Sequence, residues 1–245
     1  MSSINVMLNV IWRRICEIFF MKVNNAIDVT GLSKQVMDAT GQLTILKDIN
    51  FTVSLGDSIA ITGPSGSGKS TLLGILAGLD TPTKGDVIVN GQSIFAMDED
   101  GRAAFRARHV GFVFQSFHLL PNLTALENVM LPLELTGKPA AETAKRLLNE
   151  VGLSHRLNHY PSTLSGGEQQ RVSLARSFVQ NPTILFADEP TGSLDEETGL
   201  KIIDLIFGLH RDHGTTLVLV THDSSLAKRC NHQITLHAGE IQSIT

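Results

Sequence analysis

Eight consecutive residues have the types and spacing of a phosphate-binding loop: Gly63-Pro64-Ser65-Gly66-Ser67-Gly68-Lys69-Ser70. An apolar run over 58–62 precedes them, and a helix-like pattern over 71–79 follows. The glycines let backbone N–H groups point inward, and the helix adds the positive end of its dipole. A glycine-rich turn could match by chance, but the flanking strand and helix favour phosphate binding. The expected phosphate contacts are Gly63, Pro64, Ser65, Gly66, Ser67, Gly68, Lys69, Ser70 and Thr71.

Two carboxylates, Asp188 and Glu189, directly follow the apolar run 184–187. Ligands of an open parallel sheet bind at the carboxyl ends of its strands, which places this pair beside the phosphate loop. We expect Asp188 to bind Mg²⁺ together with the Ser70 hydroxyl, and Glu189 to act as a general base toward water. Lys69 would reach the β- and γ-phosphates of a nucleotide. The alternative is a solvated strand end before a turn.

The segment 164–171, Leu-Ser-Gly-Gly-Glu-Gln-Gln-Arg, predicts a second anion site. Ser165 is expected to cap the helix that starts after it, while Gly166 and Gly167 leave its first N–H groups uncovered. Read alone, this could be an ordinary helix cap. Beside a phosphate loop, it resembles the signature of the ATP-binding cassette (ABC) ATPases, Leu-Ser-Gly-Gly-Gln, with four of five residues matching and glutamate at 168.

The resemblance to ABC ATPases covers about residues 24–245, and its motifs follow one another in the family's order. It implies that Gln115 senses Mg²⁺ and the γ-phosphate, that 193–195 lies in the D-loop, and that His222 is the switch histidine. Gln115 and His222 each follow an apolar strand, so both reach the sheet edge that holds Asp188. In isolation, each could be an ordinary loop residue. The implied catalytic residues are Glu189, His222, Gln115 and Lys69, and the implied metal ligands are Ser70, Gln115 and Asp188.

Within this family, residues 112–129 are similar to the lipoprotein-releasing and macrolide-exporter ATPases, and the whole chain most resembles the stand-alone YbbA-like branch. The resemblance implies an ATPase at the cytoplasmic face of the inner membrane, attached to a separately encoded permease that exports or extracts hydrophobic or lipid-linked cargo. The stretch Phe117 to Leu135 would form the docking groove for the permease, or simply part of the core. A regulatory module that acts on a membrane partner without transport would use the same residues.

The resemblance also implies that a single copy of the chain holds only half of each active site. The resemblance implies that the helix end at Ser165, Gly166 and Gly167 faces away from its own phosphate loop, and therefore that the chain forms a homodimer in head-to-tail pairing. Each copy would contribute its signature to the ATP and Mg²⁺ bound by the other. ATP would then close the dimer, and hydrolysis would open it.

One position departs from the family pattern. These ATPases usually stack adenine on an aromatic residue ahead of the phosphate loop, and the matching stretch 32–36 offers Val36 instead. Stacking of a base on an aromatic side chain is worth about 1 to 3 kcal/mol. We therefore expect weak discrimination between bases, with the phosphates deciding affinity.

These motifs require an α/β fold that positions them along one sheet edge. The resemblance implies a P-loop NTPase with a RecA-like, mainly parallel core, an antiparallel β subdomain and a helical subdomain at about 116–165. Alternating strands and helices after residue 167 predict the parallel sheet. Residues 26–62 predict antiparallel strands, and Pro121, Pro132 and Pro139 predict breaks between helices. The expected strands are 26–29, 43–46, 50–53, 58–62, 110–114, 183–187, 216–220, 233–236 and 240–244, and the expected helices are 71–79, 98–108, 140–151, 196–211 and one from about 167.

Composition narrows the classes of partner. The 245 residues carry a net charge of −4, which gives no basic surface for nucleic acid, so a DNA-repair or translation cassette is disfavoured. No apolar run reaches the length of about 18 residues that a membrane span needs. The two cysteines, Cys16 and Cys230, have no metal-type spacing.

Residues 1–20 differ from the predicted ATPase domain, which covers 21–245. Asn5, Asn9, Arg13 and Glu17 recur every fourth residue among apolar side chains, so a helix would carry one narrow polar stripe. One interpretation is an amphipathic helix that rests on a membrane or a partner. The other is a start codon assigned too early, because Met21 could begin a complete domain.

Overall fold

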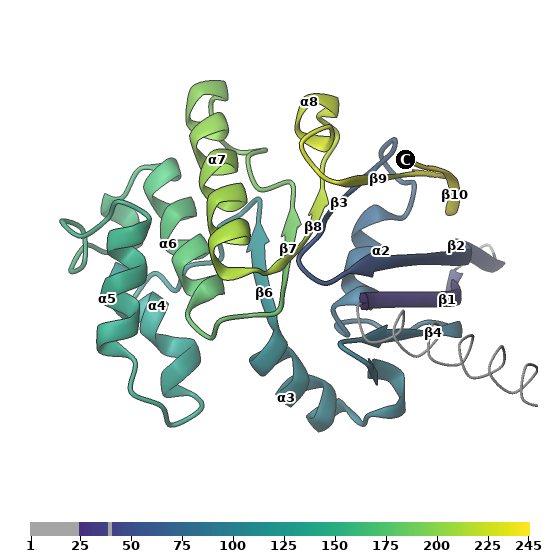
Figure 1. The fold of residues 1–245 in the computed structure, drawn as a ribbon, viewed down its shortest axis with the longest axis horizontal. Helices are drawn as coiled ribbons and strands as arrows, with labels where there is room; N and C mark the ends of the chain where they lie inside the picture. The colour runs from purple at the N-terminus through teal and green to yellow at the C-terminus, as the bar shows by residue number, and fades with distance from the viewer. Residues whose placement is uncertain (1–24, 39–40) are drawn as a thin grey trace, which may run out of the picture.

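The computed structural model describes residues 25–38 and 41–245, so the expected extension at 1–20 lies outside the described residues. Two β-sheets organise the fold (Figure 1), with strand orders β2-β1-β4-β5 and β10-β9-β3-β8-β7-β6. Helices α4 to α7 pack on one face of the larger sheet, while α2 and the smaller sheet pack on the other. The α/β class, with a parallel core and an antiparallel subdomain, is confirmed.

The larger sheet is mainly parallel. β3 pairs in parallel with β8 and β9, and β7 pairs in parallel with β6 and β8. The prediction that 58–62 joins the antiparallel strands was therefore wrong, because the partners of this strand lie more than 150 residues later, where a local pattern cannot reveal them. The strands are β3 (Ser58–Thr62), β6 (Val110–Phe114), β7 (Ile184–Asp188), β8 (Thr216–Val220), β9 (His232–His237) and β10 (Glu240–Ile244).

Alternate residues of the central strands face two hydrophobic cores. In β7, Leu185 and Ala187 pack with α4 to α7, whereas Ile184 and Phe186 pack with α2 and the antiparallel sheet. Burial on both faces explains why these strands read as unbroken apolar runs. The helices are α2 (Lys69–Leu76), α3 (Glu99–His109), α4 (Ala125–Glu134), α5 (Ala141–Glu150), α6 (Gly166–Phe178), α7 (Glu196–His213) and α8 (Ser224–Ala227), with short 3₁₀ turns η1 (Ile94–Ala96) and η2 (Pro161–Thr163).

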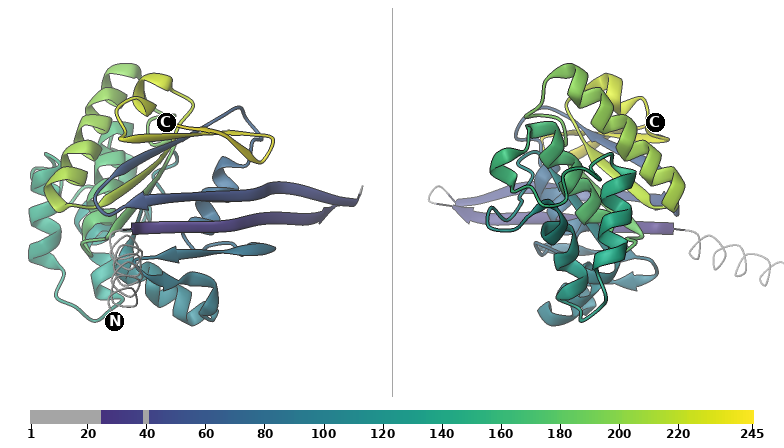
Figure 2. Two further views of the ribbon diagram at one scale, coloured as in Figure 1. Left: turned by 45° about the vertical axis from the view of Figure 1, so that its right-hand side comes forward. Right: turned by 90° about the vertical axis from the view of Figure 1, so that its left-hand side faces the viewer.

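The antiparallel sheet is built on two long strands that run side by side, β1 (Asn25–Asp38) and β2 (Gly41–Ser54), as Figure 2 shows. The predicted strands 43–46 and 50–53 are one strand, β2, with a bulge between them. Leu32 pairs with Ile49 and Lys34 with Leu46, so two residues of β2 lie across from one of β1. β4 (Lys84–Val89) and β5 (Gln92–Ser93) complete the sheet and are joined by a turn at Asn90 and Gly91.

The segment between β6 and α6 contains α4, α5 and η2, as expected for the helical subdomain. Pro132 does not break a helix, contrary to the prediction, but lies inside α4. Ala125, Val129 and Leu133 on the same helix are buried in the core with α5 and α6, and this packing outweighs the backbone hydrogen bond that proline cannot make. Gln180 also donates a side-chain hydrogen bond to the Pro132 carbonyl at 2.9 Å.

Gly239, in the turn of the C-terminal hairpin, connects the phosphate loop to β2 through backbone hydrogen bonds. Its N–H donates to the Ser67 carbonyl at 3.2 Å, and its carbonyl accepts from the Lys47 N–H at 2.8 Å. Its φ is +80°, and an added Cβ would lie 2.3 Å from the Ile45 carbonyl oxygen. A side chain therefore does not fit at this position.

Replacing Gly239 with Ala is expected to lower the free energy of unfolding by at least about 2 kcal/mol, because both the left-handed backbone and the contact with Ile45 become strained. Gly208, inside α7, is the matched control, since nothing lies within 4 Å of an added Cβ there. Gly208→Ala should raise stability by about 0.5 to 1 kcal/mol. Urea unfolding measures the free energy of unfolding of both variants. Equal changes in the two variants would contradict the prediction.

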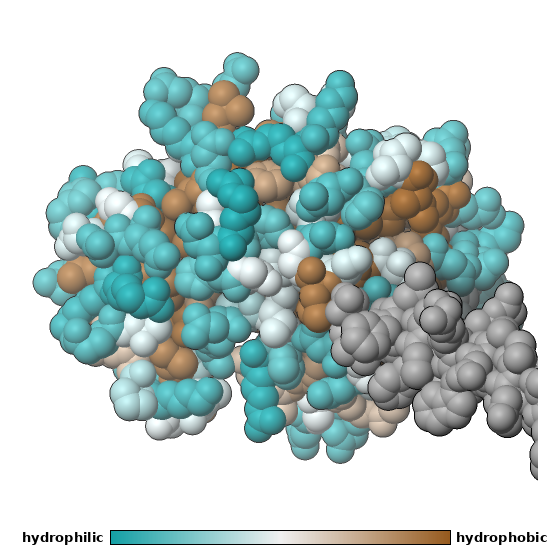
Figure 3. All heavy atoms as spheres, in the orientation of Figure 1, coloured by the Kyte–Doolittle hydropathy of each residue, from teal (hydrophilic) through white to brown (hydrophobic). Residues whose placement is uncertain are grey.

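The molecular face in Figure 3 is mostly hydrophilic. Apolar residues appear there in separate patches rather than as one continuous surface. Among the described residues, no helix is long and apolar enough to cross a membrane.

Candidate functional site

The loop 63–68 joins β3 to α2 and wraps the N-terminus of that helix. Gly63, Gly66 and Gly68 have φ values of +144°, +77° and +98°. An added Cβ on Gly63 would lie 2.1 Å from the Leu236 carbonyl oxygen, so only glycine fits there. Gly68 caps α2 without any side-chain hydrogen bond, which leaves the first N–H groups of the helix directed at the loop.

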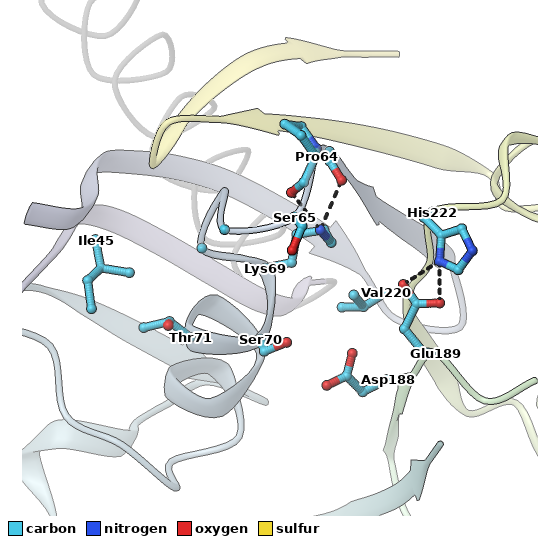
Figure 4. A pocket seen from close by; sticks show the side chains of 13 residues that line it. Ile45, Pro64, Ser65, Lys69, Ser70, Thr71, Asp188, Glu189, Val220 and His222 are labelled. Carbon is cyan, nitrogen blue, oxygen red and sulfur yellow. Dashed lines mark hydrogen bonds and ion pairs between the residues drawn. The ribbon is translucent and has the colours of Figure 1, made fainter. Parts of the chain in front are cut away.

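This loop borders a cavity of about 660 Å³ (Figure 4). Eight of the nine expected phosphate contacts line it, and Ser67 lies outside the lining. The far wall comes from the ends of β7 and β8, as predicted from the sequence. The lining residues are Ile45, Gly63, Pro64, Ser65, Gly66, Gly68, Lys69, Ser70, Thr71, Asp188, Glu189, Val220 and His222.

Two carboxylates and one histidine face the loop across this cavity. The His222 Nδ1 lies 2.7 and 2.9 Å from the two carboxylate oxygens of Glu189. Glu189 has a φ of +46°, in the left-handed region, and its N–H donates to the Val220 carbonyl at 3.0 Å. Strained non-glycine backbone of this kind is concentrated at functional sites.

Asp188 differs electrostatically from its neighbour. Burial raises the pKa of the Asp188 carboxyl, with a smaller opposing effect from a hydrogen bond with the Ser70 hydroxyl. A buried carboxylate beside a hydroxyl is suited to bind a cation, because a bound cation would favour the charged form of the carboxyl group.

The cavity fits a nucleotide phosphate chain and its metal. The Lys69 ammonium donates to the carbonyls of Gly63 and Pro64, both at 2.9 Å, and so lies over the loop that would hold the phosphates. The uncapped helix end and the glycine backbone supply N–H donors, and the Ser67 hydroxyl is buried without a partner beside them. Ser70 and Asp188 offer oxygen ligands of the type that Mg²⁺ takes.

Gln115 lies at the predicted sheet edge but outside the cavity lining. It follows β6, whose last residue pairs with Asp188. Its carbonyl accepts a hydrogen bond from the Ser193 hydroxyl at 2.9 Å, and its side-chain nitrogen would lie 2.9 Å from a Cβ on Gly192. The amide therefore packs against the turn that follows the carboxylates.

The signature helix, α6, begins as predicted. The Ser165 hydroxyl accepts from the Glu168 N–H at 3.3 Å, and the Glu168 carboxylate accepts from the Ser165 N–H at 2.9 Å, which forms a capping box. Ser165, Gly166 and Gly167 do not line the cavity that contains the phosphate loop. Within one chain, the two anion-binding elements predicted from the sequence stay separate.

The family model for the ABC transporter matches residues 46–192, more than half of the chain. The chain belongs to the ABC transporter family. It is the ATP-binding, ATP-hydrolysing subunit of that family, with the P-loop cassette fold.

Relatives of this ABC ATPase align with it over nearly their whole length. The ABC transporter ATP-binding protein YbbA of Escherichia coli K12 is 54% identical over 91% of this chain and 99% of its own. The lipoprotein-releasing system ATP-binding protein LolD of Syntrophus aciditrophicus is 48% identical over 88% of this chain and 98% of its own. The ATP-binding cassette MJ0796, solved as a dimer in a post-hydrolysis state with ADP and Pi, superimposes with a TM-score of 0.82 at 39% identity over 89% of this chain and 97% of that one.

Sequence patterns missed one residue of the cavity lining and one buried polar residue of α6. Ile45 lines the cavity, whereas Val36, the predicted position for adenine contact, does not. Gln170 is fully buried, and its side-chain amide donates to the carbonyls of Phe114 and Pro190. It thus ties α6 to the ends of β6 and β7. Gln170 lies in a polar run of the sequence, which gave no sign that its side chain is buried. Its burial follows only from the face of α6 on which it lies.

The capping box of the ABC signature predicts a pH effect. Hydrogen bonds from the Ser165 N–H, and then from its hydroxyl and from Arg156, hold the pKa of Glu168 below its ordinary value of 4.5 against the opposing effect of burial. A lowered folded-state pKa contributes stability above the unfolded-state value, and this stability is lost as pH falls through the folded-state pKa. Glu168→Gln should cost about 1 to 3 kcal/mol at pH 7 and progressively less below pH 4.5. A pH-independent difference in unfolding free energy would contradict this.

Proposed function

We propose that the chain forms a homodimer that hydrolyses two MgATP and drives a separately encoded permease in the inner membrane. The observation that best supports this proposal is that the phosphate loop and the signature helix of one chain do not share a cavity. The cavity at the phosphate loop has the lysine, hydroxyls and carboxylates for MgATP, but it lacks Ser165, Gly166 and Gly167. A second copy in head-to-tail pairing supplies them.

Within each site, Glu189 orients the attacking water, and His222 holds it against the γ-phosphate. The contact between the two side chains, at 2.7 Å, supports this shared role. Lys69 stabilises charge that develops on the phosphate oxygens. Ser70 and Asp188, with Gln115 from the neighbouring strand end, would hold Mg²⁺, which would supply positive charge toward the phosphates.

The permease docks at a groove beside the helical segment. This groove, of about 400 Å³, is bordered by Phe112, Phe114, Leu131, Pro132 and Leu135 among others. Leu79 and Leu135 at its rim are 56% and 79% exposed, and their grouping with the other apolar residues of one groove favours a partner contact. Docking there places the chain at the cytoplasmic face of the membrane through the permease.

The cargo is hydrophobic or lipid-linked, by analogy with the relatives named for lipoprotein release. Reconstitution of the chain with its permease tests the proposal. ATPase activity should rise when a lipid-linked cargo is added. Stimulation only by another protein, with no cargo effect, would instead identify a regulatory module.

Base selectivity is expected to be weak. Ile45 is an aliphatic cavity-lining residue on the strand ahead of the loop, and Val36, where the resemblance to the family places the adenine-stacking residue, is aliphatic as well and lies outside the lining. Without aromatic stacking, worth about 1 to 3 kcal/mol, the ratio of kcat/KM for ATP over GTP should stay below about a hundredfold. Steady-state kinetics with both nucleotides measures this ratio, and a larger preference would show that another residue recognises adenine.

A further inference from the structure

The signature of this chain carries a negative charge close to a proposed phosphate site. Glu168 lies three residues after Ser165, in the first turn of α6. Its side chain is only 14% exposed, so water screens its charge weakly. In the proposed dimer, the γ-phosphate of the other copy's ATP meets the start of this helix. An uncompensated carboxylate at that place would repel it.

Arg156 supplies the compensating charge. Its Nε lies 2.8 Å from the Glu168 Oε1, while the Oε2 of the same carboxylate accepts from the Ser165 N–H. Among the described residues, Arg156 is the only cation within ion-pair distance of Glu168. The His159 Nε2 lies 3.1 Å from the Arg156 Nη1, and because arginine can only donate, this ring nitrogen is the acceptor in that contact.

The arginine sits on a turn with a fixed position. The Arg156 N–H donates to the Leu153 carbonyl at 2.9 Å, and the His159 N–H donates to the Arg156 carbonyl at 3.0 Å. The start of α4 holds the same turn, because the N–H groups of Ala125 and Leu126 donate to the carbonyls of His159 and Leu157 at 2.8 and 2.9 Å. Arg156 therefore links the start of α4 to the start of α6.

We propose that Arg156 is a positioning residue that neutralises Glu168 and fixes the signature helix, so that α6 can accept the γ-phosphate bound by a second copy of this chain. The proposal rests on the proposed head-to-tail dimer. It assigns no contact with ATP to Arg156 itself. Its specific consequence is that the arginine is needed only while residue 168 is charged.

The test uses the full chain in a Glu189→Gln background, where ATP should assemble a stable dimer. The measured quantity is the ATP concentration for half-maximal dimer formation at pH 7.5, by size-exclusion chromatography with light scattering. Arg156→Ala should raise it by at least about tenfold, and adding Glu168→Gln should return it to within about threefold of the parent. Arg146→Ala is the matched control, because Arg146 is an exposed arginine of α5 paired with Glu150. Arg146→Ala should leave the ATP concentration for half-maximal dimer formation unchanged.

Binding of a fluorescent ATP analogue to the monomer separates a folding defect from the proposed role. Arg156→Ala should leave this affinity within about twofold, because the phosphate loop belongs to the same chain and does not contact Arg156. Glu168→Gln alone should leave the ATP concentration for half-maximal dimer formation unchanged or lower it. This result does not depend on whether Arg156→Ala folds well. An Arg156→Ala defect that Glu168→Gln does not rescue, or no defect at all, would overturn the proposal. Failure of the Glu189→Gln parent to dimerise with ATP would instead overturn the proposed function on which it rests.

Discussion

Glu189→Gln is expected to lower kcat for ATP hydrolysis by at least about a hundredfold, because a positioned general base contributes about 10² to 10⁴. The amide keeps the size of the carboxylate and a hydrogen-bonding oxygen but cannot take a proton from water. ATP binding should persist, since the loop and Lys69 are unchanged. The variant should accumulate as an ATP-bound dimer, which light scattering can detect.

Glu197→Gln is the matched control for this variant. Glu197 is exposed on α7, and its carboxylate pairs with Lys201 at 2.6 Å, away from the cavity lining. Surface pairs of this kind contribute at most about 1 kcal/mol, so activity should be unchanged. Full ATPase activity in Glu189→Gln would remove this residue from catalysis.

Ser165→Asp is expected to abolish ATP-driven dimer formation and to lower kcat by at least about a hundredfold. Aspartate caps helices as well as serine, so α6 should still start at the same residue. It adds, however, a negative charge where the γ-phosphate of the partner's ATP is proposed to bind. Removing one donor from a site that stabilises developing charge already costs about 10² to 10³ in kcat, and reversing the charge should cost no less.

Nucleotide binding to the Ser165→Asp monomer should stay normal, because residue 165 does not line the cavity of its own chain. Ser154→Asp introduces the same charge at an exposed position of the preceding turn and serves as the control. Equal activity of the two variants would show that the signature makes no contact with phosphate.

Sequence patterns identified the parts of the site that depend on local chemistry. The glycines at 63, 66 and 68 indicated a backbone that curls with its N–H groups inward, and all three have positive φ values that such a loop allows. The carboxylates after 184–187 indicated a strand end beside the loop. The Ser165 cap was also predicted, because a cap and its partner lie three residues apart. Each of these signals is contained in a few consecutive residues.

Features that depend on distant packing could not be predicted in this way. Strand 58–62 was assigned to the wrong sheet because its partners begin at 216 and 232. Ile45 reaches the cavity only because β2 crosses the loop, and Arg156 meets Glu168 only because the turn docks on α4. Pro132 in α4 shows the same effect, since tertiary packing outweighs a local helix breaker.

A mixing experiment tests most directly whether the site is shared between two copies of the chain. Lys69→Met should lack phosphate binding, and Ser165→Asp should lack the donated signature, so each protein alone should be inactive. In a mixed dimer, one site carries both defects and the other carries neither. Equal mixing should therefore restore about a quarter of the wild-type ATPase activity. No recovery, with both variants folded and able to form mixed dimers, would contradict a composite site.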